Sequence, residues 1–138
     1  MRRIAALLAI VFLAGCTREI EQSTRPSTVA GTYQLHSYGG RPLPAIVSND
    51  SSGVLEVTSG EFVVGSDQSW SETVDFRLTK GTRIQNTTFG SSGSWVFWRD
   101  YAYMLFNDKI DNSQFSGTAA GGTITLELLG GTNLVYQR

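Results

Sequence analysis

The chain has 138 residues, of which 41% are hydrophobic and 17% charged, a size and composition that fit one globular domain with a short extension. Two of its eleven basic residues lie in an N-terminal leader, so nine remain against twelve acidic residues, a net charge of about −3. The only two lysines, Lys80 and Lys109, are far apart in the sequence, so no basic cluster for nucleic acid is expected.

The chain begins with the pattern of an exported protein. Two arginines precede a ten-residue apolar run, 4–13, which is shorter than the about twenty residues of a membrane-spanning helix. The tetrad Leu13-Ala14-Gly15-Cys16 ends this run and resembles the bacterial lipobox. The resemblance implies a lipoprotein signal peptide over 1–15, cleavage before Cys16 and lipid on the Cys16 thiol. An ordinary secretory peptide with an incidental cysteine is the alternative.

Two further expectations concern the residues around the cysteine. Thr17 stands where Gram-negative lipoproteins kept in the inner membrane usually have Asp, so the resemblance implies the outer membrane if the host is Gram-negative. Cys16 is the only cysteine, so the exported domain has no internal disulfide. Residues 16–28 are polar and contain Pro26, which predicts a flexible tether.

The remaining residues, 29–138, show the alternation of strands. The longest run is 70–79, and shorter runs occur at 33–35, 54–57, 62–64, 84–89, 95–98, 102–106, 124–128 and 134–136. Gly-, Ser-, Asn- and Asp-rich segments separate them, including Ser59-Gly60 and the stretch from Gly90 to Gly93, which are expected as turns. The pattern predicts an all-β antiparallel up-and-down meander of eight to ten strands.

A meander of this size must protect its edges, and closure into a barrel removes them. A two-sheet β-sandwich is the alternative. Short motifs point to a family: Gly31-Thr32-Tyr33, Gly40-Arg41-Pro42-Leu43-Pro44, Gly93-Ser94-Trp95 and the closing segment 133–138. Together they resemble the small lipocalin-like domains found in many bacterial lipoproteins, which implies a small lipocalin-like β-barrel.

The first functional hypothesis is that this barrel binds a small apolar ligand without catalysing a reaction. The residues expected to line the interior are Tyr33, Leu35, Trp70, Glu72, Val74, Phe76 and Trp95. Glu72 shares the face of its apolar neighbours, where an unpaired buried carboxylate is costly. It is therefore expected near the barrel mouth, where it is solvated, pairs with an arginine or orients a ligand.

The alternative hypothesis is a protein-interaction or inhibitor module of the cell envelope. Aromatic residues crowd the segment 95–106, and a two-residue turn at Arg99-Asp100 would place aromatics on both faces of one hairpin. Outward-facing Trp98, Tyr101 and Tyr103 would then form a partner surface. Ordinary cross-strand pairing within the hairpin is the other interpretation.

Catalytic and metal signatures are weak in this sequence. His36 is the only histidine and falls on the polar face of its run, which argues against histidine-based catalysis and His-rich metal sites. No serine lies in a Gly-x-Ser-x-Gly turn, and Asp108 and Asp111 lack the spacing of a known calcium loop. We therefore expect a non-enzymatic protein without a metal or cofactor.

Overall fold

A computed structural model of the chain describes residues 26–98 and 103–138. Within these residues the chain forms one helical turn, α1 (Pro26–Val29), and ten strands. The strands are β1 (Gly31–Tyr38), β2 (Arg41–Pro42), β3 (Ala45–Asp50), β4 (Gly53–Val64), β5 (Ser69–Lys80), β6 (Arg83–Trp98), β7 (Tyr103–Asp108), β8 (Gln114–Ala120), β9 (Thr123–Glu127) and β10 (Asn133–Gln137).

The sheet closes on itself through β1. Every strand from β4 to β10 pairs antiparallel with its neighbour in sequence, and β1 pairs with both β10 and β4. In the described part of the chain this gives a closed eight-strand barrel with β2 and β3 as additional strands. The predicted meander and small lipocalin-like barrel are confirmed, and the sandwich is wrong because β1 leaves no gap between two sheets.

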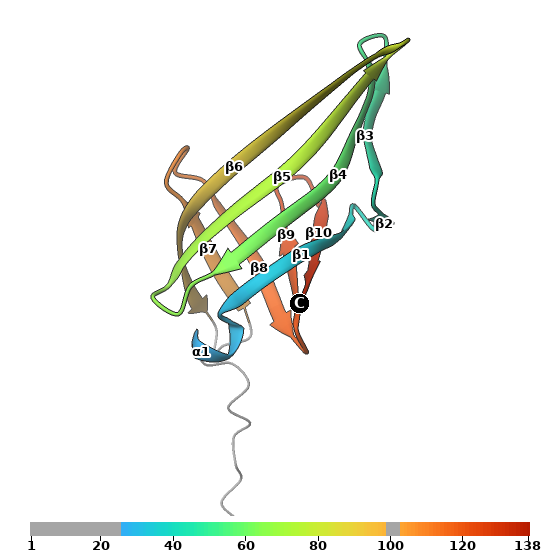
Figure 1. Cartoon of the computed structure of the whole chain (residues 1–138). Coiled ribbons are helices and arrows are strands. Elements are labelled where there is room, and N and C mark those ends of the chain that lie inside the picture. Colours follow the sequence, from blue (N-terminus) through green and yellow to red (C-terminus); the bar gives the residue numbers. More distant parts are fainter. Residues whose placement is uncertain (1–25, 99–102) are drawn as a thin grey trace, which may run out of the picture.

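Three strands are much longer than the others. β4, β5 and β6 have 12, 12 and 16 residues, whereas β1 has eight. Their outer parts, residues 53–57, 76–80 and 83–87, pair with one another, and β3 adds to β4. We call these three segments and β3 the wing, which projects from the barrel in Figure 1.

Aromatic side chains fill the barrel below the wing. The Phe62 ring lies 5.7 Å from Trp70, 5.4 Å from Phe106 and 5.3 Å from Tyr136 between ring centroids. Such pairs stabilise a core by about 0.5–1.5 kcal/mol each beyond the burial of their area. Trp70 Nε1 also donates to the backbone carbonyl of Ser94 at 3.1 Å, so its one polar atom is satisfied.

The helical turn α1 covers one end of the barrel. The Tyr33 hydroxyl donates to the Val29 carbonyl at 2.7 Å. The Arg138 guanidinium donates to the carbonyls of Thr28 and Ala30 at 3.0 and 3.1 Å, and it lies 5.3 Å from the centroid of the Tyr33 ring. Residues 26–28, expected as the end of the tether, are thus part of a turn whose backbone is held by side chains of the barrel.

Two segments expected as turns lie inside strands, and those predictions are wrong. Ser59-Gly60 belongs to β4 and Gly90 to Gly93 belong to β6. A Cβ on Gly60 would stand 3.1 Å from Leu35, where β1 closes against β4. A Cβ on Gly93 would stand 1.8 Å from the carbonyl oxygen of Asn107. Glycine is common in turns, and it is also common where neighbouring strands approach closely. Gly60 and Gly93 have the second role.

Replacing Gly93 should therefore destabilise the barrel far more than replacing Gly90. We expect Gly93→Ala to lower the free energy of unfolding by about 2 kcal/mol or more through overpacking. In Gly90→Ala the new Cβ would meet its nearest atom at 3.6 Å, an ordinary contact, so we expect a change within about 0.5 kcal/mol. Urea unfolding followed by tryptophan fluorescence measures both. Equal effects would contradict the close-approach explanation.

Candidate ligand-binding site at the barrel mouth

The barrel is open at the end of β1 that lies away from α1. A pocket of about 240 Å³ occupies this mouth. We call it the mouth pocket; it is lined by Tyr38, Glu72, Val74, Phe76, Phe89, Gly90, Ser91, Leu128 and Leu134. Its walls come from β1, β5, β6 and β10 and from the chain just after β9, so closure of the sheet is what assembles it.

Strand alternation explains why these side chains share one face. On β5, residues 72, 74 and 76 point inward, and the register pairs Glu72 with Ser91 and Val74 with Phe89 on β6. Paired residues of antiparallel strands present their side chains on the same face. The aromatic ring of Phe89 therefore lies on the inner side of the sheet, although the residue is 62% exposed.

A half-buried carboxyl group lies at the bottom of the mouth pocket. The Tyr136 hydroxyl, on the aromatic floor, donates to Glu72 Oε1. Burial raises the pKa of Glu72, the Tyr136 hydrogen bond opposes this rise, and the negative charge of Asp108 adds to it. The arginine partner considered from the sequence is replaced by a tyrosine. The other oxygen, Oε2, accepts no hydrogen bond from a described residue. It is accessible to solvent.

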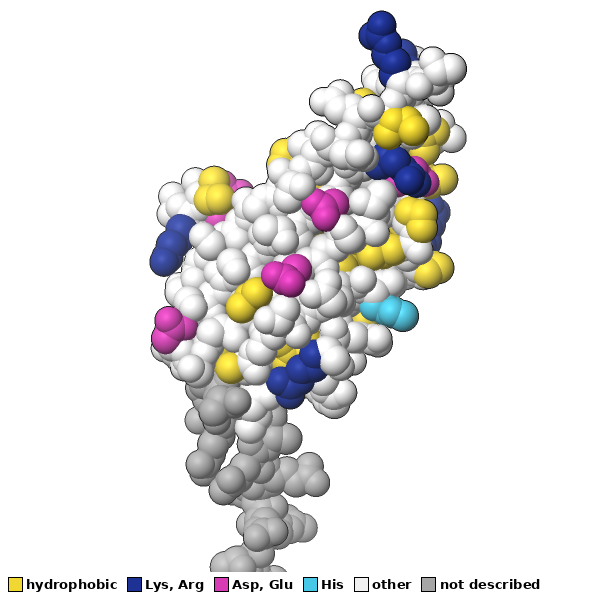
Figure 2. All heavy atoms as spheres, in the orientation of Figure 1, with side chains coloured by type: hydrophobic (Ala, Val, Ile, Leu, Met, Phe, Trp, Pro, Cys, Tyr) yellow, Lys and Arg dark blue, Asp and Glu magenta, His cyan; other side chains and the backbone are white. Residues whose placement is uncertain are grey.

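A second carboxyl group lies behind the pocket wall. Ser91 Oγ donates to Asp108 Oδ2, and the backbone N–H of Ile110 donates to Asp108 Oδ1 at 2.6 Å. Each oxygen of Asp108 therefore has a hydrogen-bond donor within the protein. Among the described residues, Glu72 is the only charged side chain that lines the mouth pocket. Figure 2 shows basic side chains at the end of the wing, where the β5–β6 turn places Lys80 and Arg83.

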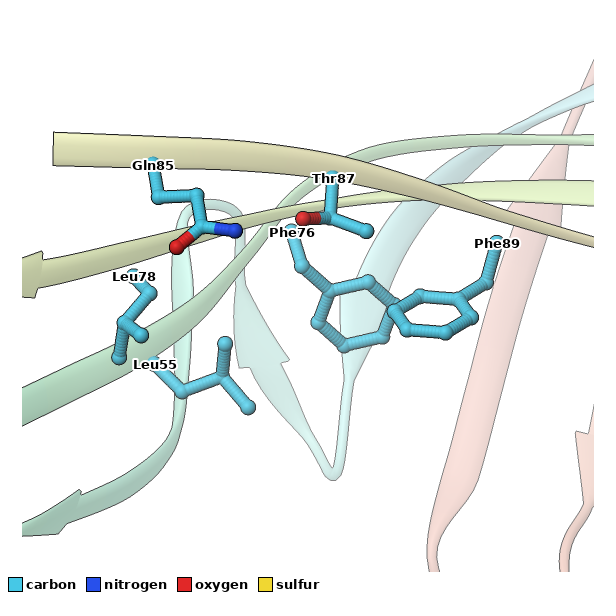
Figure 3. A pocket seen from close by; sticks show the side chains of 6 residues that line it. All are labelled: Leu55, Phe76, Leu78, Gln85, Thr87 and Phe89. Atoms are coloured by element: carbon cyan, nitrogen blue, oxygen red, sulfur yellow. The ribbon is translucent and has the colours of Figure 1, made fainter. Parts of the chain in front are cut away.

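The inner face of the wing continues the mouth pocket as an apolar groove. This wing groove also measures about 240 Å³ and is lined by Leu55, Phe76, Leu78, Gln85, Thr87 and Phe89. Figure 3 shows these side chains directed to the same side of β5 and β6. Phe76 and Phe89 line both hollows and pack edge to face, with centroids 5.4 Å apart. The two hollows therefore adjoin.

The seven residues expected to line the interior separate into two groups. Tyr33, Trp70 and Trp95 are 2%, 3% and 0% exposed and belong to the packed core, together with Leu35. Glu72, Val74 and Phe76 line the mouth pocket. The interior is thus filled by its own side chains up to the level of Glu72.

Sequence reasoning did not single out several residues of the pocket. These are Tyr38, Phe89, Ser91, Leu128, Leu134 and Tyr136, the donor to Glu72. Phe89 carried a signal, because it is apolar within the run 84–89. Whether Phe89 faces inward or outward could be assigned only from its pairing with Val74 of β5. That pairing depends on the lengths of β5 and β6.

The expected partner surface lies on the outside of the barrel. Trp98 and Tyr103 are opposite each other on β6 and β7 and are 50% and 39% exposed. Tyr101 and the turn Arg99-Asp100 lie outside the described residues, as does Cys16 with its leader. A partner for Trp98 and Tyr103 stays a prediction.

Comparisons with known proteins identify no family for this chain. No protein-family model matches the chain, and no curated protein matches its sequence. Within residues 26–98 and 103–138, no three His, Cys, Asp or Glu side chains are placed to hold a metal ion. The same part of the chain contains no helix with the length and apolarity needed to cross a bilayer.

The raised pKa of Glu72 predicts a pH-dependent gain in stability for Glu72→Gln. Because the folded protein binds this proton more tightly than the unfolded chain, its stability falls as pH rises from the ordinary value of 4.5 through the raised pKa. The stability of the variant relative to wild type should therefore increase from pH 4 to pH 8. The increase is about 1.4 kcal/mol for each tenfold difference in the proton affinity of Glu72 between the folded and unfolded chains. Urea unfolding at both pH values measures the difference, and an unchanged difference would refute a desolvated Glu72.

Proposed function

We propose that the protein is an envelope lipoprotein, anchored through Cys16, that binds a small apolar molecule at the mouth pocket without catalysing a reaction. The observation that carries the proposal is an open apolar pocket that adjoins an apolar groove in a barrel whose floor is filled. A floor packed by side chains leaves the mouth as the place for a ligand. In a Gram-negative host the proposed location is the outer membrane.

The energetic basis of the proposal is the exposure of apolar side chains on the inner face of the sheet. Phe89 is 62% exposed, and Phe76 and Leu78 are partly exposed beside it. Removing apolar surface from water contributes roughly 25 cal/mol per Å². A ligand that covers about 150 Å² of these side chains would gain about 4 kcal/mol from their burial alone.

The non-enzymatic part of the proposal rests on the chemistry of the pocket residues. Apart from Glu72, Ser91 and Tyr38, the lining is aliphatic, phenylalanine or glycine. The Ser91 hydroxyl donates to Asp108, and His36, the one histidine of the sequence, is exposed on β1 and does not line the pocket. The residues present suit binding of a ligand better than bond cleavage.

Binding should depend on Phe89 but not on Ile84, a residue of the same strand with similar exposure. Phe89 is 62% exposed on the inner face, whereas Ile84 is 65% exposed and pairs with Thr79 on the opposite face. We expect Phe89→Ser to weaken binding of the uncharged apolar dye Nile red about tenfold, because about 55 Å² of apolar contact is lost.

Fluorescence titration of residues 16–138 carrying Cys16→Ser, which keeps the protein free of lipid, measures this affinity. Ile84→Ser in the same background is the matched control and should bind the dye as the parent does. Equal losses in the two variants, or no dye binding by the parent, would refute binding at the mouth pocket.

Membrane attachment should depend on Cys16 alone. Each buried CH₂ of an acyl chain contributes about 0.8 kcal/mol, so two or more chains hold a protein on a bilayer. We expect the wild-type protein in the membrane fraction of the producing cells and Cys16→Ser in the soluble fraction. Mass spectrometry of the N-terminal peptide should find lipid on the wild-type cysteine. An unmodified cysteine would overturn the anchor.

A further inference from the structure

We propose that the ligand of the mouth pocket carries a protonated amine on an apolar body, with the amine hydrogen-bonded to Glu72 and the body in the wing groove. This inference rests on the proposed function and names the chemical class of the ligand. Three features of the pocket support it: its charge, its unused hydrogen-bond acceptor and its aromatic wall.

The charge at the mouth pocket disfavours anionic ligands. Glu72 lines the pocket, and Asp108 lies close enough to raise the pKa of Glu72 by its charge. None of the described lysines and arginines lines the pocket; Arg77, on the same strand as Glu72, pairs with Glu56 at 2.9 Å on the outer face. A fatty-acid carboxylate would be repelled by Asp108 and by ionised Glu72, whereas an ammonium group would be attracted to both and would favour ionisation of Glu72 against the burial that raises its pKa.

Three of the four oxygens of the two carboxyl groups accept a hydrogen bond within the protein. Oε1 of Glu72 accepts from Tyr136, and both oxygens of Asp108 accept from Ser91 and the Ile110 backbone. Oε2 of Glu72 has no partner among the described residues and is not enclosed by them. An ammonium group offers three donors and would form a charge-assisted hydrogen bond with this oxygen.

The aromatic residues beside Glu72 favour the same ligand. Phe76 and Phe89 stand edge to face with an interplanar angle of 87°, and Tyr38 lines the other side of the pocket. The face of an aromatic ring carries partial negative charge and attracts cations by about 0.5–2 kcal/mol, depending on exposure. Rings together with a carboxylate form the combination that recognises alkylammonium ions.

The wing groove provides the surface for the apolar body. It begins at Phe76 and Phe89, which it shares with the mouth pocket, and continues along Leu55 and Leu78. A ligand whose amine lies at Glu72 can therefore extend its hydrocarbon part along the inner face of the wing. A ligand with a charged head at one end and a linear apolar body therefore fits the sequence from Glu72 through the phenylalanines to Leu55 and Leu78.

Three probes with the same eight-carbon chain test the proposal: octylamine, octanol and sodium octanoate. Titrations at pH 7.5, followed by amide chemical shifts of the unlipidated mature chain, give the three affinities. We expect octylamine to bind at least tenfold more tightly than octanol and octanoate to bind most weakly. Glu72→Gln should reduce octylamine affinity about tenfold and leave octanol affinity unchanged, which also shows that the variant is folded.

Glu61→Gln is the matched control, because it makes the same charge change on an exposed residue of the outer face of β4. It should leave all three affinities unchanged. Equal binding of octylamine and octanol, tighter binding of octanoate, or equal effects of the two glutamate variants would overturn the amine proposal while the mouth pocket remains a binding site. Failure of every probe, Nile red included, would instead overturn the proposed function.

Discussion

The pairing of β1 with two neighbours is the constraint on which the structure depends. Residues 31–34 of β1 pair with β4, and residues 34–38 pair with β10, so eight residues close the sheet. β4, β5 and β6 are longer than this closure requires, and their excess length must project beyond the barrel. The wing is therefore a consequence of unequal strand lengths. The mouth pocket lies where the wall ends on the β1 side and continues on the β5 and β6 side.

The interior combines a packed floor with a polar group at its upper limit. Phe62 and its aromatic neighbours occupy the space that a roomy ligand cavity would need. Tyr136 belongs to both regions, because its ring packs on Phe62 and its hydroxyl donates to Glu72. A carboxyl group at this depth is tolerated because it has a donor on one oxygen and an open pocket at the other. The same arrangement raises its pKa, and among the described residues it is the one charged side chain that lines the mouth pocket.

The sequence predicted the features that depend on local alternation. The run 70–79 identified a strand and the inward face of Glu72. The density of turn residues indicated a meander, and the need to protect its edges indicated closure. The misread positions, Gly60 and Gly93, show that glycine has two uses in a sheet, and only the neighbouring strand reveals which applies. β8, a strand of mostly small and polar residues, was not recognised. Contacts such as Tyr136 to Glu72, 64 residues apart, require the register of the whole barrel.

The helical turn α1 and the mouth pocket lie at opposite ends of the barrel. Tyr33, near the start of β1, holds the backbone of α1, whereas Tyr38, at the end of the same strand, lines the mouth pocket. Residue 26 therefore joins the barrel at its closed end, and a ligand would enter and leave at the opposite end. Under the proposed anchoring through Cys16, the end of the barrel that leads to the anchor and the end that opens would therefore lie opposite each other.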